Sequence, residues 1–174
     1  PVQLAKEMSN IGIKVATPII IARTGWTTDE LKEGIVAANI ENQAYDIVSL
    51  LIGVNNQYRG RDAEQFRDEF IGLLNQAVGF AGGSKEKVFV VSIPDWGVTP
   101  FAKGRDQAKI SKEIYAYNTV CREESEKLGV KYFDITPISR EAKTNAELVA
   151  SDGLHPSAKM YKRWVEEVIV KGLE

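Results

Sequence analysis

Short segments that are almost continuously apolar recur along the chain and predict buried strands. They cover residues 46–52, 87–93 and 130–135, and a shorter segment covers residues 19–22 after a Thr-Pro pair. Apolar runs of this length without alternation are typical of parallel strands that are covered on both faces. We therefore expect four parallel strands in this sequence.

Apolar residues at helical spacing precede, separate and follow these segments. Pro1 suits the first turn of an opening helix, and Thr28 suits the N-cap of a second one. Gly129 closes a long helix, and Ser157 caps the last one. The predicted helices carry the apolar positions Val2, Leu4, Ala5 and Met8; Leu31, Ile35 and Ala38; Phe66, Phe70, Leu73, Leu74 and Ala77; Ile110, Ile114, Tyr117, Cys121 and Leu128; and Met160, Trp164, Val165, Val168 and Ile169.

The alternation of strands and amphipathic helices predicts an α/β fold with a mainly parallel sheet wound by right-handed crossovers. No repeat or low-complexity linker divides the sequence, so we expect one domain over residues 1–174. Ligands bind beyond the carboxyl ends of the strands in such sheets. Candidate chemistry is therefore expected at Gly25, in the turns 53–56 and 94–97, and in the loop that holds Asp152 and His155.

Composition narrows the range of functions. The net charge is −2 and Lys and Arg are spread over the sequence, which gives neither a basic stripe for nucleic acid nor a polybasic segment for a membrane surface. The single cysteine, Cys121, allows no intrachain disulfide or zinc motif, and its helical context predicts a buried structural thiol. The longest apolar runs are too short to span a bilayer. We expect a small-molecule substrate and neither a metal nor another cofactor.

The sole histidine, His155, lies three positions after Asp152 in the loop Ser-Asp-Gly-Leu-His-Pro. Asp152 can fold back to accept the Nδ1 proton of His155, which fixes the imidazole tautomer, and Pro156 favours an extended conformation at His155. Nε2 is then free to act as a general base. In the alternative interpretation, Asp152 caps a turn and His155 is a surface residue.

Two further strand ends offer hydrogen-bond donors. Asn55, in the Gly-Val-Asn-Asn turn 53–56, can donate its side-chain amide to a developing oxyanion, and the backbone N–H of Gly25 can do the same. Both motifs also have ordinary explanations, because Asn is frequent in turns and many α/β strands end in glycine before a helix.

Taken together, a Gly after the second strand, G-x-N after the third and D-x-x-H before the last helix resemble the SGNH/GDSL hydrolase family over essentially the whole chain. The resemblance implies a flavodoxin-like three-layer sandwich with the sheet order 2-1-3-4-5. It also implies that Gly25 and Asn55 are oxyanion donors, that His155 is the base and that Asp152 is its orienting acid. Asn56 stands where the family usually has Asp, a position that mainly supports the turn.

The family's Gly-Asp-Ser motif, at the end of the first strand, has no counterpart in this sequence. The serines Ser9, Ser49, Ser92, Ser111 and Ser157 lie in predicted helices or strands or at a cap, so none occupies the strained turn of a nucleophile. The first strand is interior in this sheet order, and its loss would leave buried N–H and C=O groups unpaired at about 1 to 3 kcal/mol each. We therefore expect roughly 20 to 30 residues upstream of Pro1 that hold this strand and the serine, and we expect residues 1–174 alone to be inactive.

Aromatic side chains fall in or near the strand-end loops. As an acyl pocket they would favour a short apolar acyl group, although packing is the more ordinary role of such residues. The substrate-binding candidates are Trp26, Asn56, Tyr58 and Trp96, with Phe101 nearby. The arginines near these loops, which either contact a polar or sugar moiety or are solvated surface charges, are Arg59, Arg61 and Arg105.

The sequence thus predicts a serine hydrolase that cleaves carboxylic esters, with a short acyl or acetyl group on a sugar or lipid, through a Ser-His-Asp triad and an acyl-enzyme. The alternative is a non-catalytic module on the same fold that binds a ligand or glycan. A flavodoxin-like nucleotide binder is disfavoured because no strand-end loop is a Gly-rich phosphate-binding run. The oligomeric state, the compartment and the choice between hydrolysis and acyl transfer stay open.

Overall fold

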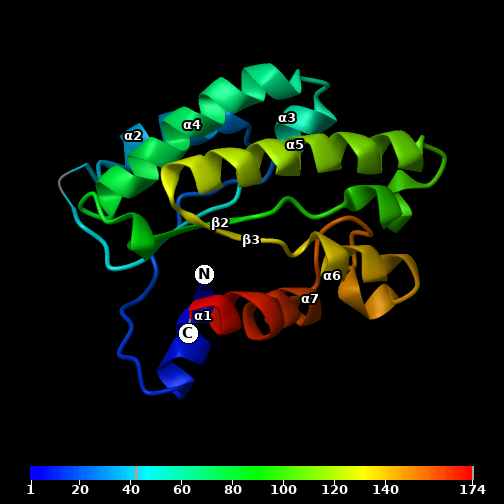
Figure 1. Ribbon diagram of the computed structural model, residues 1–174. Coiled ribbons are helices and arrows are strands. Elements are labelled where there is room, and N and C mark those ends of the chain that lie inside the picture. Colours follow the sequence, from blue (N-terminus) through cyan, green and yellow to red (C-terminus); the bar gives the residue numbers. More distant parts are fainter. Residues whose placement is uncertain (42, 174) are drawn as a thin grey trace. The chain divides into compact units, whose positions relative to one another are not determined.

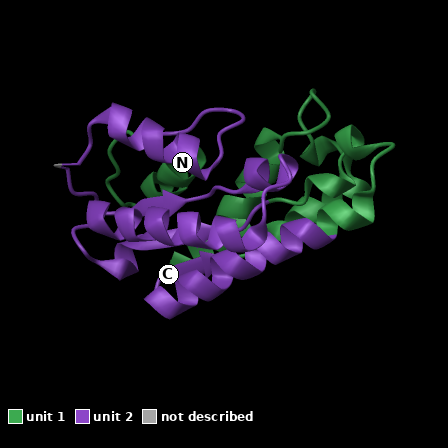
Figure 2. Cartoon of the chain, turned by 90° about the horizontal axis from the view of Figure 1, so that it is seen from above, with its two compact units in different colours: residues 1–20, 94–111, 134–174 green, residues 21–93, 112–133 purple. Residues whose placement is uncertain are grey.

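The computed structural model describes residues 1–41 and 43–173. The chain divides into two compact units, each assembled from separate segments of the sequence (Figure 2). Unit 1 comprises residues 1–20, 94–111 and 134–174, and unit 2 comprises residues 21–93 and 112–133.

Three parallel strands form the sheet of unit 2. They are β1 (Val48–Leu50), β2 (Val88–Val91) and β3 (Lys131–Phe133), in the order β1-β2-β3. All residues of the central strand β2 are buried. An α/β architecture with a parallel sheet is thereby confirmed, and each strand is shorter than the apolar segment that predicted it. The order 2-1-3-4-5 stays a prediction, because the sheet in the described residues contains only these three strands.

The fourth predicted strand, at residues 19–22, is not formed. These residues pair with no strand among the described residues, and Ile19 and Ile20 are 56% and 52% exposed. The outer edge of β1 likewise pairs with no described strand. An apolar segment becomes a strand only where a neighbour bonds to its N–H and C=O groups. The prediction at 19–22 is therefore wrong for this structure, since composition alone does not supply the neighbour.

Helices α2, α4 and α5 lie along one side of the sheet of unit 2 (Figure 1). α4 packs on β1, α2 packs on α4, and the predicted apolar stripe of α4 from Phe66 to Ala77 is buried. α5 begins in unit 1 and passes into unit 2 between Ser111 and Lys112. The bounds are α2 Thr28–Ala38, α3 Val54–Tyr58, α4 Ala63–Phe80 and α5 Gln107–Leu128, with a 3-10 helix at Lys85–Lys87.

Polar side chains and glycine fix the ends of these helices. Thr27, one residue before the predicted Thr28, is the N-cap of α2 and forms a capping box with Glu30. Asp62 caps α4 by accepting from two backbone N–H groups. Caps of this kind each stabilise a helix by about 1 kcal/mol. Gly129, at φ +78°, follows the last residue of α5, as the sequence predicts.

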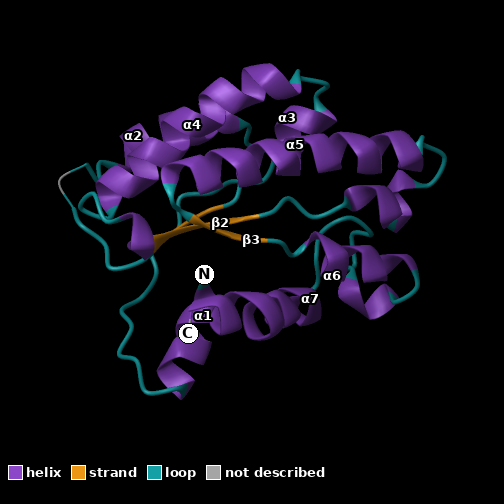
Figure 3. Ribbon diagram, in the orientation of Figure 1, coloured by secondary structure: helices purple, strands orange, loops and turns teal. Residues whose placement is uncertain are grey.

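Unit 1 is built from helices and loops in the residues that the structure describes (Figure 3). As predicted, Ser157 caps α7 by accepting from the N–H of Met160 at 3.2 Å. The helices are α1 Val2–Asn10, α6 Thr136–Arg140, α7 Ala158–Arg163 and α8 Val170–Leu173, with a π-helix at Trp164–Ile169 and 3-10 helices at Trp96–Val98, Pro100–Ala102, Glu141–Lys143 and Ala146–Leu148.

Within the described part of the chain, no helix combines the length and the apolar character that a membrane span needs. The same residues contain no group of three or more His, Cys, Asp or Glu side chains that could hold a metal ion. Cys121 is buried, as predicted, and its burial raises the pKa of the thiol, so the sulfur is held in the unreactive protonated form.

Candidate active site

A tight hairpin-like loop in unit 1 holds the predicted acid and base. The N–H of Ala150 donates to the carbonyl of His155 at 2.8 Å, and Val149 and Pro156 form an antiparallel bridge. Gly153 adopts φ +74° at the tip, a conformation that a residue with a Cβ rarely takes. The loop is thus fixed by its own backbone hydrogen bonds.

Asp152 and His155 form a hydrogen-bonded pair within this loop. Nδ1 of His155 lies 2.6 Å from Oδ2 of Asp152, while Oδ1 of Asp152 accepts from the backbone N–H groups of Leu154 and His155 at 2.9 Å each. The Leu154 N–H, the His155 N–H and the imidazole, in that order, lower the pKa of Asp152 to about 2. The carboxylate therefore stays ionised and accepts a hydrogen bond from the Nδ1–H of the imidazole.

The second ring nitrogen of His155 is available for chemistry. Nε2 has no hydrogen-bond partner among the residues that the structure describes, and the side chain is about half exposed. With Nδ1 bound to the carboxylate, the lone pair of the neutral imidazole lies on Nε2. This is the arrangement of a general base with its orienting acid.

In unit 2, the two predicted oxyanion donors come from adjoining loops. Gly25 has φ +91°, and its N–H donates to no group in the described parts of the chain. Asn55, at the start of α3, donates one amide hydrogen to the carbonyl of Trp26 at 2.9 Å. The other amide hydrogen has no partner in residues 1–41 and 43–173. The structure thus brings the loop of Gly25 and the side chain of Asn55 together and leaves one donor unused on each.

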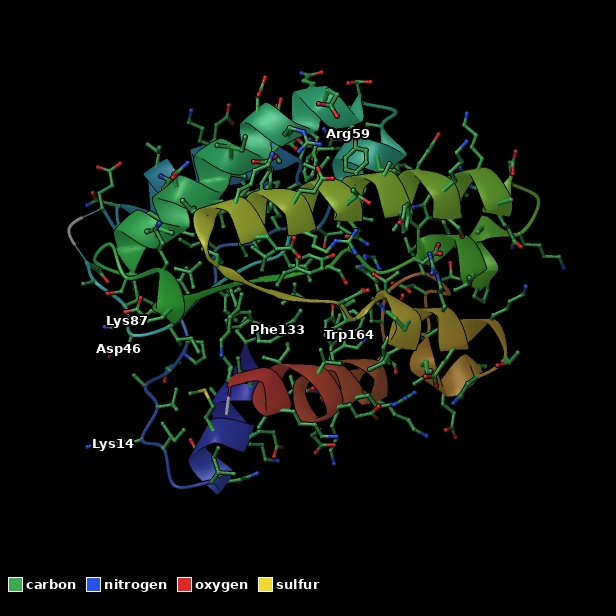
Figure 4. All side chains as sticks on the ribbon, viewed as in Figure 1. Lys14, Asp46, Arg59, Lys87, Phe133 and Trp164 are labelled. Atoms are coloured by element: carbon green, nitrogen blue, oxygen red, sulfur yellow. The ribbon has the colours of Figure 1, made fainter. Side chains whose placement is uncertain are left out.

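Two arginines tie these loops to each other. Arg59, labelled in Figure 4 near the end of α3, donates to the carbonyl of Gly25 at 2.8 Å and pairs with Glu30 at 3.1 Å. Arg61 pairs with Asp29 at 2.8 Å, and this guanidinium, with the Thr27 hydroxyl, lowers the pKa of the Asp29 carboxyl. Both arginines, considered from the sequence for substrate contact, instead brace the donor loops.

Asn56 is a supporting residue rather than a substrate contact. Its side chain is fully buried, with Nδ2 donating to Thr28 Oγ1 at 2.6 Å and to Glu69 Oε2 at 3.2 Å, and with Oδ1 accepting from the N–H of Thr28 at 3.1 Å. We therefore withdraw its assignment as a substrate-binding residue, because a buried and fully bonded amide has no free group for a ligand. Its neighbour Asn55, by contrast, reaches the donor loop.

The aromatic candidates lie in different surroundings. The ring of Trp26 packs against Gly34 of α2, where a methyl group would collide with it. Tyr58 is 48% exposed at the end of α3. In unit 1, Trp96 is buried and packs on Phe101, with ring centroids 5.9 Å apart. The guanidinium of Arg105 lies over both rings of that pair, at 5.7 and 5.0 Å.

Asp95 is a structural residue that the sequence interpretation missed. It is 1% exposed, and its carboxylate accepts from Arg140 Nε and from the N–H of Gly97 at 3.0 Å each. These bonds fix the loop that carries Trp96. A narrow cavity of about 30 Å³ in unit 1 is lined by both Trp96 and His155, so the structure brings these two predicted site residues together. The sequence signal that could have pointed to Asp95 is the Pro-Asp-Trp-Gly motif that follows a predicted strand.

No serine of the described residues is set up as a nucleophile in this cavity. Ser139 lines it, but its Oγ donates to the carbonyl of Thr136 at 2.7 Å and accepts from the N–H of Asp95 at 3.0 Å. Ser157 is likewise engaged, capping α7 and donating to the carbonyl of Glu147. The hydroxyls of Ser139 and Ser157 are thus used to hold the backbone.

Comparison with known proteins identifies the family. No curated protein sequence matches the chain closely enough to be considered. A lipase/acylhydrolase from Enterococcus faecalis has a similar structure, with a TM-score of 0.71, 18% identity and coverage of 99% of this chain and 83% of that one. The acetyl xylan esterase AlAXEase matches with a TM-score of 0.71, 15% identity and coverage of 99% and 89%. Axe2, an acetylxylan esterase from Geobacillus stearothermophilus, matches with a TM-score of 0.64, 22% identity and coverage of 95% and 78%.

At these identities the structural matches show the shared fold. The sequence itself matches the GDSL-like lipase/acylhydrolase family over residues 1–163, which is nearly its whole length. The chain therefore belongs to the GDSL-like lipase/acylhydrolase family.

Proposed function

We propose that this chain carries the base, the acid and two oxyanion donors of an ester hydrolase that works through a Ser-His-Asp triad. The observation that carries the proposal is the short Nδ1 to Oδ2 contact between His155 and an Asp152 that is held ionised, with Nε2 left unbonded among the described residues. Membership of a lipase/acylhydrolase family supports ester bonds as the target.

In the proposed mechanism, Nε2 of His155 accepts the proton of a serine hydroxyl while Oγ attacks the ester carbonyl carbon. The carbonyl π electrons move to oxygen, and the Gly25 N–H and the Asn55 amide donate to the resulting oxyanion. When the C–O bond to the alcohol breaks, His155 returns the proton to that alcohol and an acyl-enzyme remains. A water molecule then repeats the sequence and releases the acid. Asp152 stabilises the imidazolium throughout.

We propose that the serine lies outside residues 1–174, on a segment that also supplies an additional strand. Two observations support this proposal. The outer edge of β1 is unpaired among the described residues, and the apolar side chains of Ile19 and Ile20 are exposed. A further strand would pair with such an edge and cover apolar side chains. The engaged hydroxyls of Ser139 and Ser157 support it as well.

The proposed substrate is a short acyl ester, with an acetyl group on a sugar as the favoured case. Two of the structural neighbours are named as acetyl xylan esterases, and this supports an acetylated carbohydrate. The narrow cavity beside His155, about 30 Å³ with Trp96 in its wall, has space for a small acyl group and not for a long chain.

The test is hydrolysis of p-nitrophenyl acetate by the full-length gene product. His155→Ala should lower kcat by roughly 10³-fold or more, because both proton transfers depend on the imidazole. Asn75→Ala, at an exposed position on α4, is the matched control and should keep full activity. Undiminished turnover by His155→Ala would contradict the assignment.

A second candidate is a non-catalytic module that binds an acylated glycan on the same fold. The engaged hydroxyl of Ser139 beside His155 favours it, because residues 1–174 then need no nucleophile. Labelling by a fluorophosphonate separates the two candidates. A serine hydrolase forms a covalent adduct that His155→Ala suppresses, whereas a binding module forms none in the full-length gene product.

A further inference from the structure

A second and larger pocket opens on unit 1 beside the loop that holds the acid and base. Its volume is about 530 Å³, within the range of pockets that hold small molecules. Ser151 and Gly153, the residues on either side of Asp152, line it. A molecule in this pocket would therefore touch the same loop that positions His155.

The lining of this pocket is positively charged. Lys103 and Lys143 belong to it, and no Asp or Glu does. Neither lysine forms an ion pair or a side-chain hydrogen bond in the part of the chain that the structure describes. The whole chain has a net charge of −2, so the charge of this pocket lining is opposite in sign to that of the whole chain.

Three carboxylates close to the pocket residues in sequence have other partners. Glu141 pairs with Arg163, with an oxygen to nitrogen distance of 2.5 Å, and Glu147 pairs with Lys159. Asp152 is held by His155 and by two backbone N–H groups. These three acids are therefore not paired with Lys103 or Lys143, and the charged groups in the lining that an anion from outside the chain would meet are two ammonium groups.

The remaining lining suits a molecule with hydroxyl groups and an apolar face. Ser151, Thr144 and the amide of Gln107 offer hydrogen-bonding groups, while Val98, Pro100 and Val149 provide apolar walls. Sugars combine such features, because their hydroxyl groups and their C–H faces are arranged on one ring. The charge adds a requirement for an anionic oxygen group on that ring.

We propose that this pocket binds the alcohol half of the ester substrate and that this half is a hydroxylated anion, a sugar that bears a carboxylate or a phosphate. That the bound molecule is the alcohol half of an ester rests on the proposed function. The presence of an anion-binding pocket rests on the lining and charge alone.

Binding is measured by isothermal titration calorimetry on the full-length gene product, with glucuronate, glucose 6-phosphate and neutral glucose as the ligands. Both anions should bind about tenfold more tightly than glucose, and the tighter of the two identifies the anionic group. Lys103→Gln combined with Lys143→Gln should remove this preference and leave the affinity for glucose unchanged. The preference should also shrink with added salt.

The matched control is Lys14→Gln combined with Lys32→Gln. It removes the same charge from exposed positions outside the pocket, one of which is labelled in Figure 4. It should keep the anion preference. An equal loss in both double variants, or equal affinity for glucose and the two anions in the unaltered protein, would overturn the proposal.

The assay separates this inference from the proposed function. If the full-length gene product binds anions through Lys103 and Lys143 but has no esterase activity, the triad is contradicted and the pocket is supported. If the protein has esterase activity but no preference for anions, the pocket proposal is contradicted and the triad is supported.

Discussion

At the scale of single residues, two neighbouring asparagines have different tasks because they differ in burial. Asn56 is fully buried, and both the oxygen and the nitrogen of its side-chain amide bond to Thr28. Asn55 is partly exposed and donates one amide hydrogen to the carbonyl of Trp26. The resemblance to the family already assigns the oxyanion to Asn55 and the support of the turn mainly to Asn56, although Asn56 is also predicted to bind substrate. Only the direction in which α3 turns each side chain decides which of them can serve an oxyanion.

Asp152 allows a prediction about pH. Its pKa is lowered to about 2, chiefly by the Leu154 and His155 backbone N–H groups. The stabilisation that its ionised form gives the folded loop is therefore complete above about pH 4, the ordinary carboxyl value, and is lost as the pH falls through 2. A carbon-13 NMR titration of the Asp152 carboxyl should give a midpoint near 2.

In His155→Ala the midpoint should rise only in part, because the two backbone N–H groups still donate to the carboxylate. A complete return to the ordinary value in this variant would show that the imidazole, and not the loop backbone, sets the charge of Asp152.

At the scale of elements, the donor loops depend on a buried polar cluster that joins three helices. Asn56 of α3 bonds to Thr28 of α2 and Glu69 of α4, and Thr28 also bonds to Glu69. Each of the three side chains bonds to the other two, so removal of the Asn56 amide takes a bond from both partners and leaves the buried Thr28 N–H without an acceptor. The position of Gly25 and Asn55 thus depends on the packing of α2, α3 and α4.

Asn56→Ala should lower the free energy of unfolding by about 2 to 3 kcal/mol, because it unpairs the buried Thr28 N–H and removes one of the donors to the Glu69 carboxylate. Urea unfolding followed by circular dichroism measures the change. Asn75→Ala on the exposed side of α4 removes an amide of the same size and should cost less than about 0.5 kcal/mol. Equal effects of the two variants would argue against the cluster as a joint between the helices.

At the scale of the whole molecule, α5 is the element that belongs to both units. Its residues up to Ser111 lie in unit 1 and those from Lys112 in unit 2, without a break in the helix. Because a helix propagates one hydrogen bond at a time from its neighbours, melting of one half destabilises the other.

We therefore expect both units to unfold in one urea transition. Trp26→Phe leaves Trp96 and Trp164, both in unit 1, as fluorescent reporters, and the double variant Trp96→Phe, Trp164→Phe leaves Trp26 in unit 2. Within each variant, fluorescence and circular dichroism should give the same midpoint. A dichroism curve with two steps, only one of which coincides with the fluorescence, would mean that α5 does not couple the units.

Much of this architecture follows from the sequence, for identifiable reasons. The helices carry apolar stripes at helical spacing, which periodicity predicts, and three of the four continuous apolar segments contain paired strands, which burial on both faces predicts. Residues 19–22 fail because pairing depends on a neighbour that composition does not describe. The loop of Asp152 and His155 was predictable because both residues lie within one turn, whereas the role of Asp95 depends on Arg140, 45 positions away.

The closeness of Asp152 and His155 in the sequence has a consequence for how the site is built. Their mutual geometry is set by four consecutive residues and the hydrogen bonds of a single loop, so it needs no agreement between distant parts of the chain. Acid and base are therefore held in position together by one local loop. A redesign that grafts residues 148–157 onto another hairpin of similar width should carry the pair with it, while the donors at Gly25 and Asn55 would have to be rebuilt separately.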